Sequence, residues 1–405
     1  MGEGMVSCSN QEWLDSVYDK LLVKMKAECA RVGANIPYTT GKDGMYHDIT
    51  ETPWGNKETS PDGVGFWTNG FWPGMLWQMY QATGDEEYRK AAVGVEERLD
   101  VLLKSAETVD HDVGFLFLLS SVANYRKTGD KEARRRGLLA ASLLSSRYNL
   151  DGRFIRAWPD YMAGAAKNFG DSNGDIRGWM IIDCMMNIPL LYWASEETKD
   201  PRFKKIAINH AKTAQQYIVR PDGSCNHIVA FDPDTGEYLT NPGGQGYRKG
   251  SSWSRGQSWA VYGFALSYRH TGDPSFLDTA KQCAHYCVAN MAVSGWLPLV
   301  DYRQPAQPVK YDSTAAMITA CGLLEIASHV EENEARFYTE AAYRILQASE
   351  ARFANWDPEQ DSILTGGTYF YHDPSGENTE VPIIYADYFF IEAVLRLKGK
   401  GLFEW

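Results

Sequence analysis

A repeated pair of amphipathic stretches joined by a short polar turn is the feature that most constrains how this chain can fold. The clearest copies are LWQMYQATGDEEYRKAA, VANYRKTGDKEARRRGLLAA, LLYWASEETKDPRFKKIAINHA and ALSYRHTGDPSFLDTAKQCA, with a looser copy in LLEIASHVEENEARFYTEAA. In three turns a glycine able to end a helix in the left-handed conformation precedes an aspartate favoured as an N-cap, namely Gly84–Asp85, Gly129–Asp130 and Gly272–Asp273. Apolar residues at spacings of three and four flank the turns. The pattern therefore predicts repeated helical hairpins and an α/α architecture.

Helices expected around Trp13–Arg31 and Tyr385–Leu397 bring the number of hairpins to about six, enough for an all-α toroid that buries its inner helices. No Pro/Gly/Ser-rich linker interrupts the series, so we expect one domain spanning residues 1–405. Long turn-rich segments between the helices commonly carry function, and they are residues 37–72, 157–177, 221–252, 293–312 and 353–382.

Composition excludes several classes of partner. The net charge is −12 and no Lys/Arg-rich run occurs, which argues against nucleic acid, although a local cation could still hold a small anionic fragment. No apolar stretch is long enough to span a membrane, and the N-terminus lacks the pattern of a secretory signal, so we expect a cytoplasmic protein. The seven cysteines include no Cys-x-x-Cys pair, which favours buried reduced thiols, and Cys283 and Cys287 are spaced for a core stripe.

Two candidate clusters lie early in the chain. In FWTNGFWPGMLW, Trp67 and Trp72 precede a predicted helix and could form a sugar-stacking platform or core packing. In DHDVGFLFL, His111 and Asp112 stand at the start of an apolar helix. Asp112 is either a functional carboxylate or simply the N-cap of that helix.

Asp183 lies inside the apolar run GWMIIDCMMNIPLLYW, where a charged carboxylate is costly. Burial would raise its pKa, which suits a group that must hold a proton near neutral pH. The alternative is a structural carboxylate satisfied by a partner such as Arg177. We favour the functional interpretation, because strongly perturbed carboxylates cluster at active sites.

A later segment, HIVAFDPDTGEY to GGQGYRKGSSWSRGQSWAVYGF, supplies His227, Gln245, Arg255 and Trp259. Arg255 precedes an amphipathic helix and is a natural counter-ion for a substrate carboxylate. The DPDTG stretch lacks the ligand pattern of a calcium loop. Motifs of serine hydrolases, P-loop proteins, zinc proteases and dinucleotide-binding proteins are absent from the sequence, so paired acids with aromatic residues indicate carbohydrate chemistry.

Together these motifs resemble those of unsaturated glucuronyl hydrolases of glycoside hydrolase family 88. The similar stretches are WTNGFWPG, HDVGF, IIDCMMNIPLLYW, the segment from His227 to Gly246, WSRGQSWAVYGFAL, DSTAAMITACGLLEIAS and YADYFFIEAVLRL. The resemblance covers roughly Trp13 to Glu404 and implies an (α/α)6 barrel, in agreement with the hairpin pattern. It also implies that no metal or organic cofactor is needed.

The resemblance further implies roles for individual residues. Asp183 matches the general acid/base of the family and Asp112 its second catalytic carboxylate. The positions that match the substrate pocket are Trp67, Trp158, His227, Gln245, Arg255 and Trp259. The chain departs from the family in a longer loop between Trp158 and Asp183, which could act as a partial lid. No Lys or Arg occurs in residues 366–380, so a preference for 6-sulfated sugars is unsupported.

The implied substrate is an oligosaccharide, such as a disaccharide, whose terminal uronic acid carries a C4=C5 double bond. Asp183 would protonate C4 and then activate water for attack at C5. Rival interpretations are an unsaturated rhamnogalacturonyl hydrolase, an α/α-barrel sugar epimerase and a non-catalytic oligosaccharide-binding protein. A monomer or small homo-oligomer is expected. The natural substrate, its linkage and its sulfate tolerance stay open.

Overall fold

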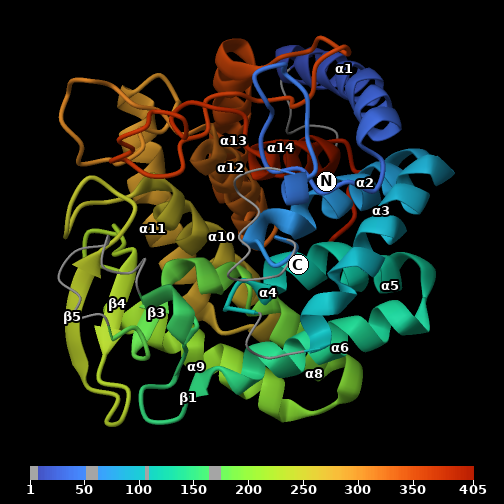
Figure 1. Ribbon diagram of the computed structural model, residues 1–405. Helices are drawn as coiled ribbons and strands as arrows, with labels where there is room; N and C mark the ends of the chain where they lie inside the picture. The colour runs from blue at the N-terminus through green and yellow to red at the C-terminus, as the bar shows by residue number, and fades with distance from the viewer. Residues whose placement is uncertain (1–7, 52–62, 105–108, 164–174) are drawn as a thin grey trace.

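The computed structural model describes residues 8–51, 63–104, 109–163 and 175–405. The chain folds as the predicted (α/α)6 barrel, in which inner helices are covered by outer ones (Figure 1). The inner layer contains α2 (Phe71–Thr83), the series α4 (Val113–Phe117), π-helical η5 (Leu118–Val122) and α5 (Ala123–Thr128), α8 (Pro189–Thr198), α10 (Ser254–Thr271), α12 (Ser313–Ala327) and α14 (Ile384–Leu397). The outer layer contains α1 (Cys8–Val32), α3 (Glu86–Leu99), α6 (Lys131–Ser146), α9 (Pro201–Tyr217), α11 (Pro274–Val293) and α13 (Glu332–Phe353).

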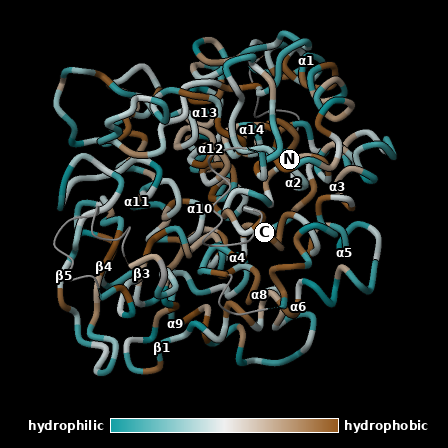
Figure 2. The backbone as a smooth tube through the Cα atoms, viewed as in Figure 1, coloured by the Kyte–Doolittle hydropathy of each residue, from teal (hydrophilic) through white to brown (hydrophobic). Residues whose placement is uncertain are grey.

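Burial separates the two layers. Every residue from Ser313 to Ile326 of α12 is buried, whereas the outer helix α13 buries only one face. Figure 2 shows hydrophilic residues along the outer loops and hydrophobic residues concentrated along the helices of the interior. Cys283 and Cys287 lie fully buried on α11, as the predicted core stripe requires. Burial of these faces drives the helices into a ring, because apolar surface removed from water contributes about 25 cal/mol per Å².

The predicted turns are confirmed in detail. Gly84 ends α2 in the left-handed conformation at φ 73°, and the side chain of Asp85 accepts a hydrogen bond from the Glu87 N–H of α3. The α10–α11 turn repeats this arrangement with Gly272 and Asp273. These signals were readable because each turn depends only on residues adjacent in sequence.

Small sheets add to the all-α expectation, partly within the turn-rich segment 221–252 and partly outside the predicted loops. Strand β3 (Trp179–Ile181) pairs with β4 (Ile228–Phe231), and β4 pairs with β5 (Tyr238–Gly243), all antiparallel, at one edge of the molecule (Figure 1). A second, two-stranded sheet joins β1 (Tyr148–Asn149) to β2 (Phe154–Ile155). Short 3-10 helices are η1 (Ile49–Glu51), η2 (Trp67–Gly70), η3 (Asp100–Lys104), η6 (Asp160–Met162) and η8 (Ile182–Met186).

The N-terminal ends of the inner helices meet on one face of the barrel. Arg255 in the first turn of α10 pairs with Asp312, the N-cap of α12. Trp67, just before α2, contacts Tyr385 at the start of α14, with ring centroids 4.9 Å apart. The opposite face holds the C-terminal ends, where Arg269 of α10 pairs with Glu325 of α12.

No helix in the described ranges is long and apolar enough to cross a bilayer. All seven cysteines have free thiols, and all except Cys8 are buried. Two predictions concern segments that extend beyond these ranges. The expected lack of a secretory signal involves residues 1–7, and the suggested lid involves residues 164–174. Both of these parts lie outside the described residues.

Candidate active site

Asp183 follows directly after a strand, at the start of a 3-10 helix. It is the second residue of η8, directly after β3, and α8 begins only at Pro189. Because β3 pairs with β4, the Ile182 N–H donates to the His227 carbonyl at 3.1 Å. This pairing brings His227 Nε2 to 3.5 Å from Asp183 Oδ2.

The hydrogen bonds around His227 define its tautomer. The Gln245 backbone N–H donates to His227 Nδ1 at 3.0 Å, so Nδ1 is the unprotonated acceptor. The proton of the neutral ring therefore sits on Nε2, which faces Asp183. Gly244 permits this contact, because a Cβ at that position would lie 2.0 Å from His227 Nδ1. The ring also packs against Trp253, with centroids 4.3 Å apart.

The pKa of Asp183 is lowered, in contrast to the predicted increase. Burial raises it, but the interactions with His227, 3.5 Å away, and with the Arg255 guanidinium outweigh burial. The prediction was wrong because the apolar run was treated as a uniform environment, whereas the fold brings polar partners from a later segment. Arg177, the suggested structural partner, instead pairs with Asp175. Asp183 therefore favours its ionised form.

Asp112 precedes α4 but does not cap it. Its side chain makes no hydrogen bond to the helix N-terminus, so the N-cap interpretation is wrong. Its Oδ1 instead accepts a hydrogen bond from Asn187 Nδ2 at 2.9 Å, and its Oδ2 lies 3.5 Å from His111 Nε2. Asp112 is thus a buried carboxylate directed away from its own helix.

Asp112 holds a proton more readily than Asp183, because its pKa is raised whereas that of Asp183 is lowered. Burial, followed by the negative charges of Asp110 and Asp183, raises the pKa of Asp112 well above its usual value. Burial lowers the pKa of His111 to about 3, so this imidazole is neutral and supplies no counter-charge. Asp112 and Asp183 therefore differ sharply in proton affinity, as acid and base partners commonly do.

Arg255 is buried, and its two terminal nitrogens are hydrogen-bonded within the protein. Its Nη1 donates to Asp312 Oδ2 at 3.0 Å and to the Thr368 carbonyl at 2.7 Å. Its guanidinium carbon lies 4.4 Å from the centroid of the Trp253 ring. We expected an open counter-ion for a substrate carboxylate. The structure instead shows a cation already paired with the Asp312 carboxylate. The Nε of Arg255 has no hydrogen-bond partner among the described residues.

Gln245 connects the His227 segment to the C-terminal loop. Its side-chain Nε2 donates to the Tyr369 carbonyl at 2.8 Å, and its own carbonyl accepts from the Tyr371 N–H at 2.8 Å. Arg255 Nη2 donates to the same Tyr369 carbonyl at 2.5 Å. Gln245 thus holds His227 through its backbone and the loop through its side chain.

The predicted tryptophans divide into two groups. Trp67 and Trp158 are half-buried, and Trp158 packs against Trp179 with centroids 5.7 Å apart. Trp259 is fully buried on α10, where Phe115 and Phe389 cover its ring at 5.3 and 5.7 Å. Trp72 is also fully buried, as its core-packing interpretation required. Among these rings, Trp67 and Trp158 have accessible surface for stacking on a sugar.

The described part of the chain contains no group of three or more His, Cys, Asp or Glu side chains placed to hold a metal ion.

Comparison with known proteins decides the family: residues 39–292 match the model of Glycosyl Hydrolase Family 88. The chain belongs to this family. It is therefore a glycosidase, and the epimerase and non-catalytic interpretations are set aside.

Relatives in family 88 cover most of the chain. An unsaturated glucuronyl hydrolase from Bacillus sp. (strain GL1) is 39% identical over 337 residues, which are 82% of this chain and 86% of that protein. An unsaturated chondroitin disaccharide hydrolase from Streptococcus pneumoniae is 36% identical over 347 residues, covering 84% and 83%. The crystal structure of the unsaturated glucuronyl hydrolase from Bacillus sp. GL1 matches with a TM-score of 0.81 at 35% identity, covering 95% of this chain and 97% of that one.

Two residues of this family 88 site were missed in the sequence. Asp312, the partner of Arg255, stands at a helix start where it also accepts from the Thr314 N–H, so it resembled an ordinary N-cap. Asn187 contacts Asp112 from 75 positions away. An amide inside the apolar run MMNIP was the available signal, since a buried amide needs hydrogen-bond partners.

Proposed function

We propose that the active site removes a 4,5-unsaturated uronic acid from the non-reducing end of oligosaccharides made by polysaccharide lyases. The observation that carries this proposal is the placement of Asp183 against His227, beside a second buried carboxylate, in a family 88 barrel. The names of the Bacillus and Streptococcus relatives support the same substrate class.

The chemistry follows from the vinyl ether of such a substrate. Asp183 donates a proton to C4, and positive charge develops at C5 and the ring oxygen. Water then attacks C5 while the Asp183 carboxylate accepts its proton. The hemiketal opens to a C5 ketone, the ring oxygen becomes a hydroxyl on C1, and this hemiacetal releases the shortened sugar. Because hydration precedes bond cleavage, the carboxylate spacing that separates retaining from inverting glycosidases does not apply.

The proton must reach Asp183 when substrate binds, because the lowered pKa of this group favours its ionised form. We propose that Asp183 and Asp112 share one proton, which rests on Asp112 when the site is empty. The substrate carboxylate adds a negative charge and displaces water, and both effects raise the pKa of Asp183. The reactive state then has Asp183 protonated and Asp112 ionised, with Asp112 directed at ring hydroxyls or water.

The remaining predicted residues would hold the sugar. Trp67 and Trp158 offer ring faces, while His227 and Gln245 orient substrate or water. Arg255 contributes its positive charge and its unpaired Nε to the substrate carboxylate, while Asp312 holds the guanidinium in place. Trp259 supports Phe115, and hence the helix that follows Asp112, from within the core.

Unsaturated disaccharides from chondroitin, hyaluronan, heparin and pectin lyases would test the substrate class. We expect loss of the absorbance of the conjugated double bond for at least one uronate-containing glycan and no cleavage of the matching saturated glucuronide. In D₂O the released keto acid should carry deuterium at C4. Cleavage of the saturated compound would contradict the hydration mechanism, and activity on the pectin product alone would favour the rhamnogalacturonyl alternative.

The wider setting is also a proposal. A cytoplasmic location is supported by six buried cysteines with free thiols, which suit a reducing compartment. One catalytic domain over residues 1–405 is supported by pairs that join distant parts of the chain, such as Arg31 with Asp361 and Asp15 with Lys398. Gel filtration would distinguish a monomer from a small homo-oligomer.

A further inference from the structure

Asn187 bridges the carboxylate of Asp112 and the backbone of Asp183. It lies four positions after Asp183, in the turn between η8 and α8, and its side chain is fully buried. Its Nδ2 donates to Asp112 Oδ1 at 2.9 Å and to the Asp183 carbonyl at 3.2 Å. One amide group therefore contacts both segments of the site.

The orientation of this amide is set from the other side. Asn187 Oδ1 accepts the Phe115 backbone N–H at 2.7 Å and so satisfies the helix end that Asp112 leaves uncapped. With Oδ1 held by a backbone donor, Nδ2 must face the Asp112 carboxylate. A rotated amide would set two donors together at Phe115 and two oxygens together at Asp112.

Close packing between Gly114 and Asn187 fixes the position of the Asn187 backbone against α4. A Cβ on Gly114 would lie 2.5 Å from Asn187 Cα and 2.6 Å from its carbonyl oxygen, so only glycine allows α4 to approach this turn. Only one oxygen of Asp112 is engaged by Asn187. The other faces neutral His111 at 3.5 Å and is available for a proton or for substrate.

We propose that Asn187 is a positioning residue, which orients the Asp112 carboxylate and controls how readily the Asp112–Asp183 pair releases its proton. This inference rests on the proposed function, because it assigns Asn187 to the same reaction. The Asn187 hydrogen bond stabilises the ionised form of Asp112 and so lowers its pKa against the effect of burial. Without it, the shared proton stays longer on Asp112 and reaches Asp183 less often.

Asn124 provides a matched control. It is also a buried asparagine, on α5, and its Nδ2 donates to a carboxylate oxygen, Glu96 Oε2, at 2.8 Å, while its Oδ1 accepts from Thr128 at 2.8 Å. Asn124→Asp therefore repeats the structural damage of Asn187→Asp at a position outside the site. Any general loss of stability should appear in both variants.

The test compares Asn187→Asp, Asn187→Ser and Asn124→Asp by thermal unfolding and by pH–rate profiles on an unsaturated disaccharide that the wild type cleaves. We expect both Asn187 variants to lose about tenfold to a hundredfold in kcat with little change in KM. The basic limb of the Asn187→Ser profile should move to higher pH by about one unit, since a hydrogen bond to an ionised carboxylate is worth that much. Asn187→Asp should move it at least as far, because its new carboxylate lies against Asp112. Asn124→Asp should keep the wild-type profile.

Folded Asn187 variants with wild-type kcat and pH profile would overturn the inference, as would a loss confined to KM. If Asn187→Asp fails to fold, the milder Asn187→Ser decides by the same criteria. A wild-type protein that cleaves none of the unsaturated disaccharides would instead refute the proposed function, so the two failures are distinguishable.

Discussion

At the C-terminal ends of the inner helices Glu325 contacts Arg269, His329 and Arg396, whereas at their N-terminal ends Asp183 faces His227 at 3.5 Å. Arg269 contacts both oxygens of Glu325 at 2.5 and 2.9 Å, and His329 Nε2 lies 2.8 Å from one of them. Asp183 Oδ2 makes no hydrogen bond within the described part of the chain. Within the same barrel, Glu325 is thus saturated with partners, whereas Asp183 keeps one carboxylate oxygen without a hydrogen bond.

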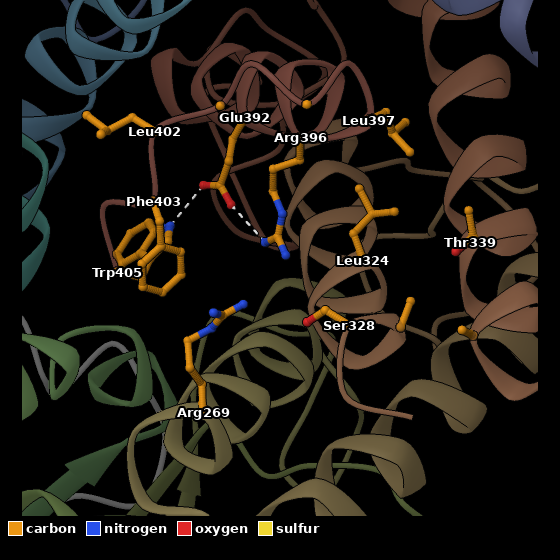
Figure 3. Close-up of a pocket in the computed structure, with 14 residues that line it drawn as sticks. Arg269, Leu324, Ser328, Thr339, Glu392, Arg396, Leu397, Leu402, Phe403 and Trp405 are labelled. Atoms are coloured by element: carbon orange, nitrogen blue, oxygen red, sulfur yellow. Dashed lines mark hydrogen bonds and ion pairs between the residues drawn. The ribbon is translucent and has the colours of Figure 1, made fainter. Parts of the chain in front are cut away.

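The saturated end is a structural network. Figure 3 shows Glu392 between Trp405 and Arg396, with contacts of 2.8 Å to Trp405 Nε1 and 3.5 Å to Arg396 Nη1. These residues line a cavity of about 370 Å³ together with apolar side chains such as Leu324 and Phe403. Buried polar groups are normally hydrogen-bonded, so a buried carboxylate oxygen without a partner, such as Asp183 Oδ2, needs an explanation.

Glu325→Ala should give the largest effect on stability. Removing one member of a buried ion-pair network leaves the arginines uncompensated, which costs about 3–5 kcal/mol in the free energy of unfolding. Denaturant unfolding would measure it, and turnover per folded molecule should stay at the wild-type level. A variant that is as stable as the wild type but inactive would show that Glu325 serves the reaction and not stability.

Acid should weaken the Glu325 network next. Burial opposes ionisation of Glu325, but His329 and Arg396 hold its pKa well below the usual value. A carboxylate with a lowered folded-state pKa stabilises the protein above its unfolded pKa of about 4.3, and this contribution is lost as pH falls further. Thermal unfolding between neutral and acid pH should therefore show a steeper loss for the wild type than for Glu325→Gln. Parallel curves would contradict this.

Asp112→Asn should give the smallest change in stability, and it should stabilise the protein at neutral pH. Because the folded-state pKa of Asp112 is raised, the protein loses stability as pH rises above the unfolded pKa of about 3.9. The amide removes this loss, so the melting temperature at neutral pH should rise on the order of 2 °C while turnover falls. A lower melting temperature at neutral pH would show that Asp112 serves stability.

The hairpins could be predicted from the sequence because their signals are local. Gly84 with Asp85 and Gly272 with Asp273 define turns without reference to the rest of the chain. The strand before Asp183 could not be predicted in this way, because its partner β4 comes from a distant segment. Because this strand was not predicted, the pKa of Asp183 was predicted to be raised, whereas it is lowered by His227, which directly precedes β4.

The site was therefore only partly predictable. Residue types and motif resemblance identified Asp183, Asp112 and His227, which the fold brings together. They did not identify what each side chain contacts: the Arg255–Asp312 pair spans 57 positions, and the Asn187–Asp112 pair spans 75. Non-local partners of this kind decide which buried carboxylate holds a proton.

Turnover of an unsaturated disaccharide by Asp183→Asn, compared with the wild type, tests the central claim most directly. The asparagine keeps the shape of the side chain near His227 but cannot carry a proton between substrate and water. We predict a folded protein whose loss of double-bond absorbance is slower by about a hundredfold or more. A folded variant with near-normal turnover would contradict the assignment of Asp183 as the acid/base of this enzyme.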